Sequence, residues 1–232
     1  IGQYGTDALR YTLVTATAIG QDVFLSEERF AAGRNFANKL WNATRFVLST
    51  VQGSRFKVQG PPLTFNLEPR TLSVPDRWIL SRLQRTITRV TKSLDELLFN
   101  DAANTLYDFL WHDVCDWYLE IVKVQLAASS KLQATSSGAS QAGSLQPAAC
   151  SQTLAVLMQV LETSLRLLHP IMPFVTEELW QYVRSVSGFE FRVSGSTETQ
   201  NSKLETRNSI MVAEWPKAAK RLIDDEAEGL ME

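Results

Sequence analysis

Apolar residues recur at alternating intervals of three and four along two long stretches of the chain. The first stretch, 76–98, places six aliphatic side chains on one helical face: Leu80, Leu83, Ile87, Val90, Leu94 and Leu97. The second begins at Asn100 or Asp101, continues to 127 and carries a matching stripe: Ala103, Leu106, Leu110, Val114, Trp117, Ile121 and Val124. Facing apolar stripes of this kind predict two neighbouring helices of a bundle.

Four further segments are predicted to be helical: 6–18, 26–51, 151–168 and 174–186. Thr6 and Ser26 are candidate N-caps of the first two helices, because a hydroxyl at this position accepts a hydrogen bond from a free backbone N–H. The prediction for the whole chain is therefore an all-α fold, an antiparallel helix bundle that occupies residues 1–186.

Three segments lack helical periodicity. The stretch 54–75 contains four prolines and is predicted to be a connector. Residues 129–147 hold one charged residue and no aromatic residue, so they are predicted to be a disordered insertion. The C-terminal part, 187–232, is predicted to be a mixed loop with a short extended segment at 209–216 and an acidic tail.

The composition is that of an ordinary soluble domain, with 44% apolar and 21% charged residues among 232. The 23 basic residues are balanced by 25 acidic residues, so a uniformly basic surface of the kind that binds DNA is not expected. The imbalance is local, because six acids and three bases follow from Glu214 to the end. No apolar run approaches the roughly 18 residues of a membrane span, so no membrane association is expected.

Cys115 and Cys150 lie far apart in unlike surroundings, so neither a disulfide framework nor a metal site is expected. The chain starts with Ile1 rather than methionine and leads directly into a helix, which predicts an excised internal segment of a longer protein.

The helix at 26–51 has an unusual polar face. The face opposite its apolar stripe gathers Asn35, Asn38, Lys39, Asn42 and Phe46, with Arg34 and Arg45 at its border. A nucleobase can stack on an aromatic ring, and its edge can pair with amide or cationic groups. This face is therefore a candidate base-reading surface. The alternative is that the asparagines are only solvated and Phe46 packs under a neighbouring loop.

The helix at 76–98 carries four basic residues on a stripe opposite its apolar face: Arg82, Arg85, Arg89 and Lys92. A row of cations can follow a phosphate backbone without reading sequence. The alternative is that these residues are solvated helix formers on an exposed face.

Acidic and aromatic residues cluster between 108 and 120. Carboxylates such as Asp113 and Asp116 can act as acid and base partners, although ion pairs within the bundle are the commoner use of such residues. His112 and His169 have no clustered Cys or His neighbours, and the chain has no glycine-rich phosphate loop or nucleophile elbow. We therefore predict no catalytic residue and no metal ligand in this segment.

Six stretches resemble, in the same order, stretches of the valyl-tRNA synthetases. They are YGTDALRYTL (4–13), GQDVFL (20–25), RNFANKLWNATRFVL (34–48), DRWILSRL (76–83), DFLWHDVCDWYLEIVK (108–123) and HPIMPFVTEELW (169–180). The resemblance covers residues 1–216. The related isoleucine and leucine enzymes share the first and last stretches, whereas the third stretch with CDWYLE is far more specific to the valine enzymes.

The resemblance implies the anticodon-binding domain of a class I synthetase, an enzyme that joins valine to its tRNA using ATP and magnesium. The HIGH and KMSKS motifs that handle ATP are not found in this segment, so no cofactor is expected here. The implied partners are tRNA(Val) and the catalytic domain of the same polypeptide. The anticodon domain of the isoleucine enzyme is the alternative within the class. The divergence of the connectors favours the mitochondrial matrix over the cytoplasm.

The resemblance also implies roles for single residues. Lys39, Arg45 and Phe46 match family positions that approach the two invariant bases of valine anticodons. The family often places an arginine near Glu28 and Arg29, and Glu28 stands at that position here. In the family a coiled coil that braces the tRNA commonly follows the segment.

We therefore expect Phe46 to stack on an anticodon base, and Asn35, Lys39, Asn42 and Arg45 to donate hydrogen bonds. Two other hypotheses remain. In one, the basic stripe and the acidic tail dock a protein partner. In the other, Asp113 or Asp116 serves an autonomous hydrolase.

Overall fold

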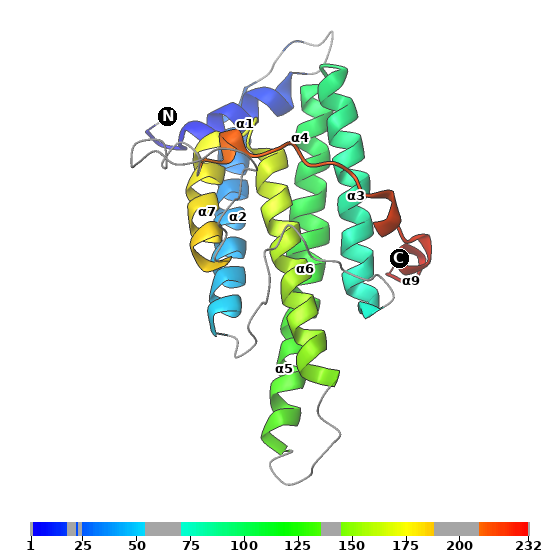
Figure 1. Cartoon of the computed structure of the whole chain (residues 1–232). Coiled ribbons are helices and arrows are strands. Elements are labelled where there is room, and N and C mark those ends of the chain that lie inside the picture. The colour runs from blue at the N-terminus through cyan, green and yellow to red at the C-terminus, as the bar shows by residue number, and fades with distance from the viewer. Residues whose placement is uncertain are drawn as a thin grey trace, which may run out of the picture.

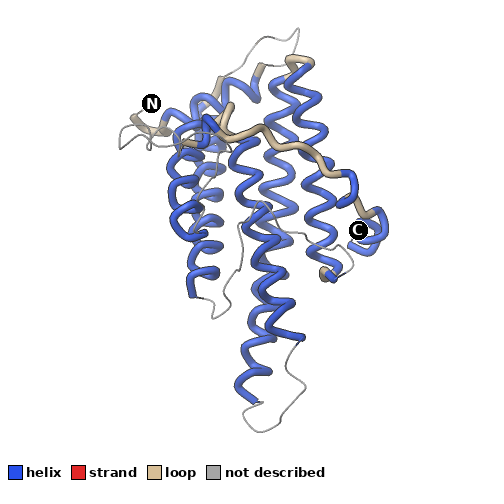
Figure 2. The backbone as a smooth tube through the Cα atoms, in the orientation of Figure 1, coloured by secondary structure: helices blue, strands red, loops and turns tan. Residues whose placement is uncertain are grey.

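The computed structural model describes residues 2–17, 22, 25–53, 71–135, 145–187 and 209–231, and these ranges contain helices and turns but no β-strand (Figures 1 and 2). The long helices lie side by side in one bundle, as the all-α prediction requires. The α-helices are α1 (Thr6–Ala16), α2 (Glu27–Gly53), α3 (Val74–Asp95), α4 (Phe99–Asp108), α5 (Leu119–Thr135), α6 (Leu145–Leu168), α7 (Pro173–Ser187) and α9 (Asp225–Met231). A π-helix, η3 (Phe109–Tyr118), joins α4 to α5, and two 3₁₀ turns, η4 (Ile210–Val212) and η5 (Lys220–Leu222), precede α9.

The start of α1 is joined to the start of α7. Asp7 is 7% exposed, and its carboxylate accepts hydrogen bonds from the backbone N–H groups of Phe174 (3.3 Å) and Val175 (2.6 Å). Arg10, one turn later, donates to the carbonyl oxygens of Pro170 (3.1 Å) and Ile171 (3.2 Å). A carboxylate at a helix N-terminus satisfies free N–H groups and opposes the positive end of the helix dipole. Residues 4–13 and 169–180, distant in sequence, therefore form one junction.

The prediction that Thr6 caps α1 is wrong. The N-cap position is Gly5, whose φ of +88° lies in the left-handed region, and no side chain caps this end of the helix. The neighbouring Asp7 does not cap α1 either; its carboxylate accepts hydrogen bonds from the first N–H groups of α7.

Helix α2 crosses α1 at Gly33, where the two backbones approach closely. A Cβ atom at this position would lie 2.9 Å from the carbonyl oxygen of Ala8 and 3.2 Å from the hydroxyl of Thr12. The close contact between α1 and α2 therefore requires glycine at position 33, whereas the conformation of α2 alone does not.

Replacing Gly33 with alanine is expected to lower the free energy of unfolding by about 1 kcal/mol. Alanine should gain about 1 kcal/mol from helix propensity, but forcing a methyl group against the α1 backbone costs about 1–3 kcal/mol. Urea unfolding would measure the difference. Gly229→Ala in α9 is the matched control, because its added methyl group would meet no atom within 4 Å. A Gly33→Ala protein as stable as the control would contradict the close approach.

The π-helix η3 changes which residues face the core. A π turn holds roughly one residue more than an α turn, so the apolar stripe of the preceding helix is displaced around the axis. The stripe predicted for 101–127 is buried through Val114, but Trp117 is 63% exposed and Val124 is 69% exposed. Tyr118, Leu119 and Val122 fill the core in their place. The predicted core assignment is therefore wrong after Val114, because it assumed an uninterrupted α-helix.

The segment 209–231 lies across the bundle and ends against α3 (Figure 1). Glu177 of α7 accepts hydrogen bonds from the Ser209 hydroxyl (2.8 Å) and the Ile210 N–H (3.1 Å). Further along, the Trp215 indole donates to Thr91 of α3 (2.9 Å). Part of the stretch expected to be extended, Ile210–Val212, is a 3₁₀ turn. The described C-terminal residues therefore pack on the helical bundle.

The segment 129–147 is only partly described. Helix α5 continues to Thr135 and α6 begins at Leu145, so helices occupy both ends of the segment predicted to be disordered, and that prediction is wrong there. Residues 136–144 lie outside the described residues, as does most of the predicted connector, 54–70. No helix in the described ranges has the length and apolar character needed to cross a bilayer.

Candidate nucleic-acid interface

The polar face of α2 lies at the surface, as the helical periodicity predicted. Asn35, Asn38 and Asn42 are exposed along this face, and Phe36 and Leu40 between them are buried in the core. Three charged residues of the N-terminal half of α2, Glu28, Arg29 and Arg34, are also exposed. The guanidinium of Arg34 lies 5.4 Å from the ring centre of Tyr4. The exposure of these side chains was predicted correctly, and their contact with RNA stays a prediction.

Lys39 is held in a defined position beside η3. Its ammonium group donates to Asp116 (2.6 Å) and lies 3.8 Å from the ring centre of Trp111. The hydrogen bond from Lys39 lowers the pKa of Asp116, and His112, 3.3 Å away, contributes to the same shift. An ammonium group has three N–H donors, so Lys39 can donate to a further acceptor while it binds Asp116.

Phe46 is half-buried rather than turned fully outward, so the prediction of an open ring is wrong in part. The ring packs against the core, and the ammonium group of Lys123 in α5 lies 5.0 Å from its centre. Lys123 is exposed and pairs with Glu120 (2.6 Å). A cation at this distance interacts with the ring face, worth about 0.5–1 kcal/mol at an exposed site. A base that stacks on Phe46 must therefore share the ring with Lys123 or displace it.

Lys39 and Phe46 face the same neighbouring element. Lys39 pairs with Asp116, 77 positions later in the sequence, and Phe46 meets Lys123 at the same separation. Helix α2 and the element formed by η3 and α5 therefore run parallel, with exposed Asn42 between the two contacts. We call this the α2–η3 seam, formed by Lys39, Asn42 and Phe46 of α2 with Asp116 and Lys123.

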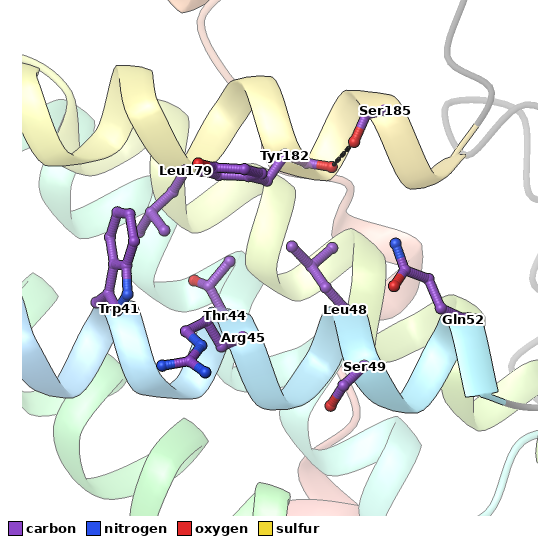
Figure 3. Close-up of a pocket in the computed structure, with 9 residues that line it drawn as sticks. All are labelled: Trp41, Thr44, Arg45, Leu48, Ser49, Gln52, Leu179, Tyr182 and Ser185. Atoms are coloured by element: carbon purple, nitrogen blue, oxygen red, sulfur yellow. Dashed lines mark hydrogen bonds between the residues drawn. The ribbon is translucent and has the colours of Figure 1, made fainter.

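Arg45 does not join this seam. It lies about 100° around α2 from Phe46, where it lines a pocket shared with α7 (Figure 3). Neighbouring residues of an α-helix project about 100° apart, and Arg45 lines this pocket whereas Phe46 lies beside Lys123. The sequence grouped these residues correctly as surface residues of one helix but did not separate the two grooves.

Each basic residue of the α3 stripe lies near a carboxylate, which comes from another element except for Glu96 at the C-terminal end of α3 itself. Arg82 binds Asp113 (2.8 Å), Arg89 binds Asp101 (2.8 Å), and Lys92 lies 3.8 Å from Glu96. The hydrogen bond from Arg89 is the main cause of the lowered pKa of Asp101. The stripe is therefore not a row of unpaired cations, and its contact with a phosphate backbone stays a prediction.

Arg85, in the same stripe, binds two carboxylates of α9. Its Nε atom lies 2.7 Å from Glu228, and its Nη2 atom binds Asp225. About two turns earlier in α3, Arg77 binds Asp224 (2.9 Å). The stripe and the acidic tail therefore pair with each other. The features that suggested docking of a separate protein partner are accounted for within the chain.

The acidic cluster does not form an acid–base pair. Asp113 binds Arg82 and Asp116 binds Lys39, so each carboxylate has its own basic partner. Burial is the main cause of the raised pKa of Asp113. Burial likewise raises the pKa of the Cys115 thiol to about 11, which keeps this thiol protonated at neutral pH. Within the described residues no three His, Cys, Asp or Glu side chains are grouped as metal ligands.

Two functional candidates were missed in the sequence. Trp111 supports the Lys39 ammonium group, and Lys123 covers Phe46. Both lie within 108–123, whose aromatic and charged residues marked it as unusual, but no local pattern indicates that this segment faces α2.

An all-helical bundle that presents an amide-rich helix face beside fixed cations has the architecture of a helical RNA-recognition domain. Residues 76–232 match the family described as "Anticodon-binding domain of tRNA ligase", and the chain belongs to this family. Outside the matched range, α1 and α2 pack on the same bundle.

The chain is similar to valine–tRNA ligases of several bacteria. It is 41% identical to that of Laribacter hongkongensis over 231 residues, which is 100% of this chain and 21% of the relative. It is 38% identical to that of Dehalococcoides mccartyi (100% and 22%) and 37% identical to that of Thermotoga maritima (98% and 21%). The chain therefore spans about a fifth of the length of these curated relatives.

A solved structure shares the fold. It is the ternary complex of a LeuRS from Agrobacterium radiobacter K84 with tRNA and LeuAMS, which matches 96% of this chain and 20% of that chain with a TM-score of 0.56. The sequence identity is 18%, so this likeness concerns the fold alone.

Proposed function

We propose that this chain is the anticodon-reading domain of a valine–tRNA ligase and binds the anticodon loop of tRNA(Val) along α2. The main observation that supports this proposal is the α2–η3 seam. There the exposed amide of Asn42 lies between the positioned ammonium group of Lys39 and the ring of Phe46. The similarity to valine–tRNA ligases over the whole chain supports the choice of amino acid. In the full-length enzyme, ATP and magnesium serve the attachment of valine in a separate catalytic domain.

The seam provides three kinds of contact to a splayed loop. The amide of Asn42 can both donate to and accept from a base edge. Lys39, oriented by Asp116 and Trp111, can donate to a ring acceptor or a phosphate. The Phe46 ring provides a surface for base stacking, worth roughly 1–3 kcal/mol per base. Because Lys39 is already positioned, less side-chain entropy is lost on binding than for a free lysine.

Phe46→Ala is expected to weaken binding of a hairpin with a valine anticodon loop by roughly five- to 150-fold, the equivalent of one lost stack. Asn42→Ala is expected to reduce discrimination between this hairpin and one with a changed second or third anticodon base. Fluorescence anisotropy with both hairpins at fixed salt would measure the affinities.

Two substitutions outside the seam are matched controls. Phe174→Ala removes an exposed ring of α7, and Asn104→Ala removes an exposed amide of α4. Equal binding of both hairpins by the unmodified chain, or unchanged affinity in Phe46→Ala, would reject the proposed function.

A further inference from the structure

A second concave site lies beside α2, on the flank of this helix that packs against α7. It is a cavity of about 340 Å³ between α2 and α7, open to solvent on one side (Figure 3). Small-ligand pockets in proteins occupy roughly 300–1,000 Å³, so this one is suited to a single small group rather than to a folded partner.

The walls of the cavity include two aromatic rings from different helices. Trp41 of α2 and Tyr182 of α7 meet edge to face, with ring centres 6.1 Å apart and planes at 86°. Tyr182 is 47% exposed, so part of its ring is available to a ligand. Unpaired RNA bases are commonly stacked on aromatic side chains such as tyrosine and tryptophan.

The cavity has both paired and unpaired polar groups: Ser49 and Ser185 donate to the backbone carbonyl oxygens of Phe46 and Tyr182, whereas two other polar residues have no such partner in the described part of the chain. Arg45 is exposed and forms no ion pair with any residue in the described ranges, in contrast to the paired arginines of α3. The hydroxyl of Thr44 is fully buried at the cavity wall and has no hydrogen-bond partner among the described residues. Gln52 contributes an amide further along α2.

We propose that this α2–α7 pocket binds one unstacked nucleotide of the same RNA loop that the proposed function places on the α2–η3 seam. The base lies against Tyr182 and Trp41, and its phosphate binds Arg45, whose planar guanidinium suits phosphate oxygens. The inference rests on the proposed function and adds to it a second nucleotide subsite.

The position of the pocket matches a loop that straddles α2. Arg45 and Phe46 are consecutive but face different grooves, and an α-helix with its side chains is only about 10–12 Å across. RNA loops are recognised with their bases splayed apart, so different nucleotides of one loop can enter the two grooves. One nucleotide would then bind in the pocket and another at the seam, with α2 between them.

The test uses the chain with a valine anticodon hairpin and with a series of hairpins that each lack the base at one loop position. Arg45→Gln and Tyr182→Ala are each expected to weaken binding of the intact hairpin by roughly five- to 100-fold. For one abasic hairpin, Tyr182→Ala is expected to have no further effect, because the base that this residue contacts is already absent. Phe46→Ala is expected to keep its effect on that same hairpin.

Two controls separate local effects from general ones. Arg221→Gln removes an exposed positive charge outside the pocket, and Phe174→Ala removes an exposed ring of the same helix as Tyr182. Thermal unfolding of each variant would identify substitutions that act through stability. Tyr182→Phe retains the ring and is expected to bind the intact hairpin as the unmodified chain does.

The outcomes of this test are distinguishable from those of the proposed function. If the hairpin binds and Phe46→Ala weakens it, but Arg45→Gln and Tyr182→Ala have no effect, the pocket is not a subsite and the proposed function stands. If adenosine 5′-monophosphate alone saturates the pocket while hairpin binding ignores the pocket variants, the inference is likewise rejected. If no hairpin binds, the proposed function itself fails and the subsite fails with it.

Discussion

Replacing Asp76 with alanine is expected to lower the free energy of unfolding by about 3–5 kcal/mol. Asp76 is 1% exposed, and its carboxylate accepts hydrogen bonds from the hydroxyls of Tyr118 (2.6 Å), Thr153 (2.8 Å) and Ser73 (2.7 Å). These donors belong to η3, to α6 and to the residue that caps α3. Removal of the carboxylate would leave several buried donors unpaired at one point, and each unpaired donor costs about 1–3 kcal/mol.

Urea unfolding monitored by circular dichroism would measure this loss. Asp95→Ala near the end of α3 is the matched control, because Asp95 is an exposed aspartate of the same helix, and its removal should change stability by less than about 0.5 kcal/mol. Tyr118→Phe, combined with Asp76→Ala in a double-mutant cycle, should show strong coupling between the two residues. Additive effects, or a loss below about 1 kcal/mol, would show that the carboxylate does not organise this junction.

Arg166→Ala is expected to produce a second large loss of stability, about 3–5 kcal/mol near neutral pH. Arg166 donates to Glu162 (2.7 Å), whose side chain is 6% exposed, and also to the carbonyl oxygen of Glu214 (2.9 Å) in the C-terminal segment. Without Arg166, a nearly buried carboxylate has no cationic partner.

The loss in Arg166→Ala is expected to depend on pH. Burial raises the pKa of Glu162 above its ordinary value even with Arg166 present, although Arg166 opposes this shift. Without Arg166 the pKa of the folded state should rise further. A carboxyl whose pKa is raised on folding favours the folded state at low pH, and this contribution is lost as the pH rises through the folded pKa. The deficit should therefore be smallest near pH 4.5, the ordinary value, and grow as the pH rises above it.

Denaturant midpoints across this pH range would test the expectation. Lys123→Ala removes the basic partner of an exposed ion pair with Glu120 and should cost no more than about 1 kcal/mol at any of these pH values. The double variant Glu162→Gln, Arg166→Met should recover much of the lost stability, because neither charge then remains buried. A pH-independent deficit in Arg166→Ala would show that lost packing, rather than an unpaired carboxylate, causes the instability.

The helices were predictable because their periodicity is local. The stripe from Leu80 to Val90 and the buried residues Phe36, Leu40 and Val47 of α2 follow directly from the spacing of apolar residues, and the structure buries them. The exposure of Asn35, Asn38 and Asn42 follows from the same periodicity. The burial that follows the π-helix was not predictable in this way, because η3 interrupts the α-helical spacing of apolar residues.

The arrangement of charges was not predictable from any single helix. On a helical wheel, Arg85 is an exposed cation, yet in the fold two carboxylates of α9 bind it across a sequence separation of more than a hundred residues. The same holds for Lys39, which the wheel places beside exposed asparagines and which the fold pairs with Asp116. Electrostatic partners depend on distance in space, and separation along the chain does not determine that distance.

By itself, the sequence determined the helical class, the faces that enter the core, the amide-rich face of α2 and the resemblance to synthetase anticodon domains. Only the tertiary structure decided that Phe46 is half-covered, that Arg45 lines a pocket between α2 and α7, and that the cations of the α3 stripe lie near carboxylates. The physical reason is the range of the interactions. Helix formation and amphipathicity depend on residues three or four positions apart, whereas pockets, ion pairs and ring contacts depend on which helices the packed core brings together.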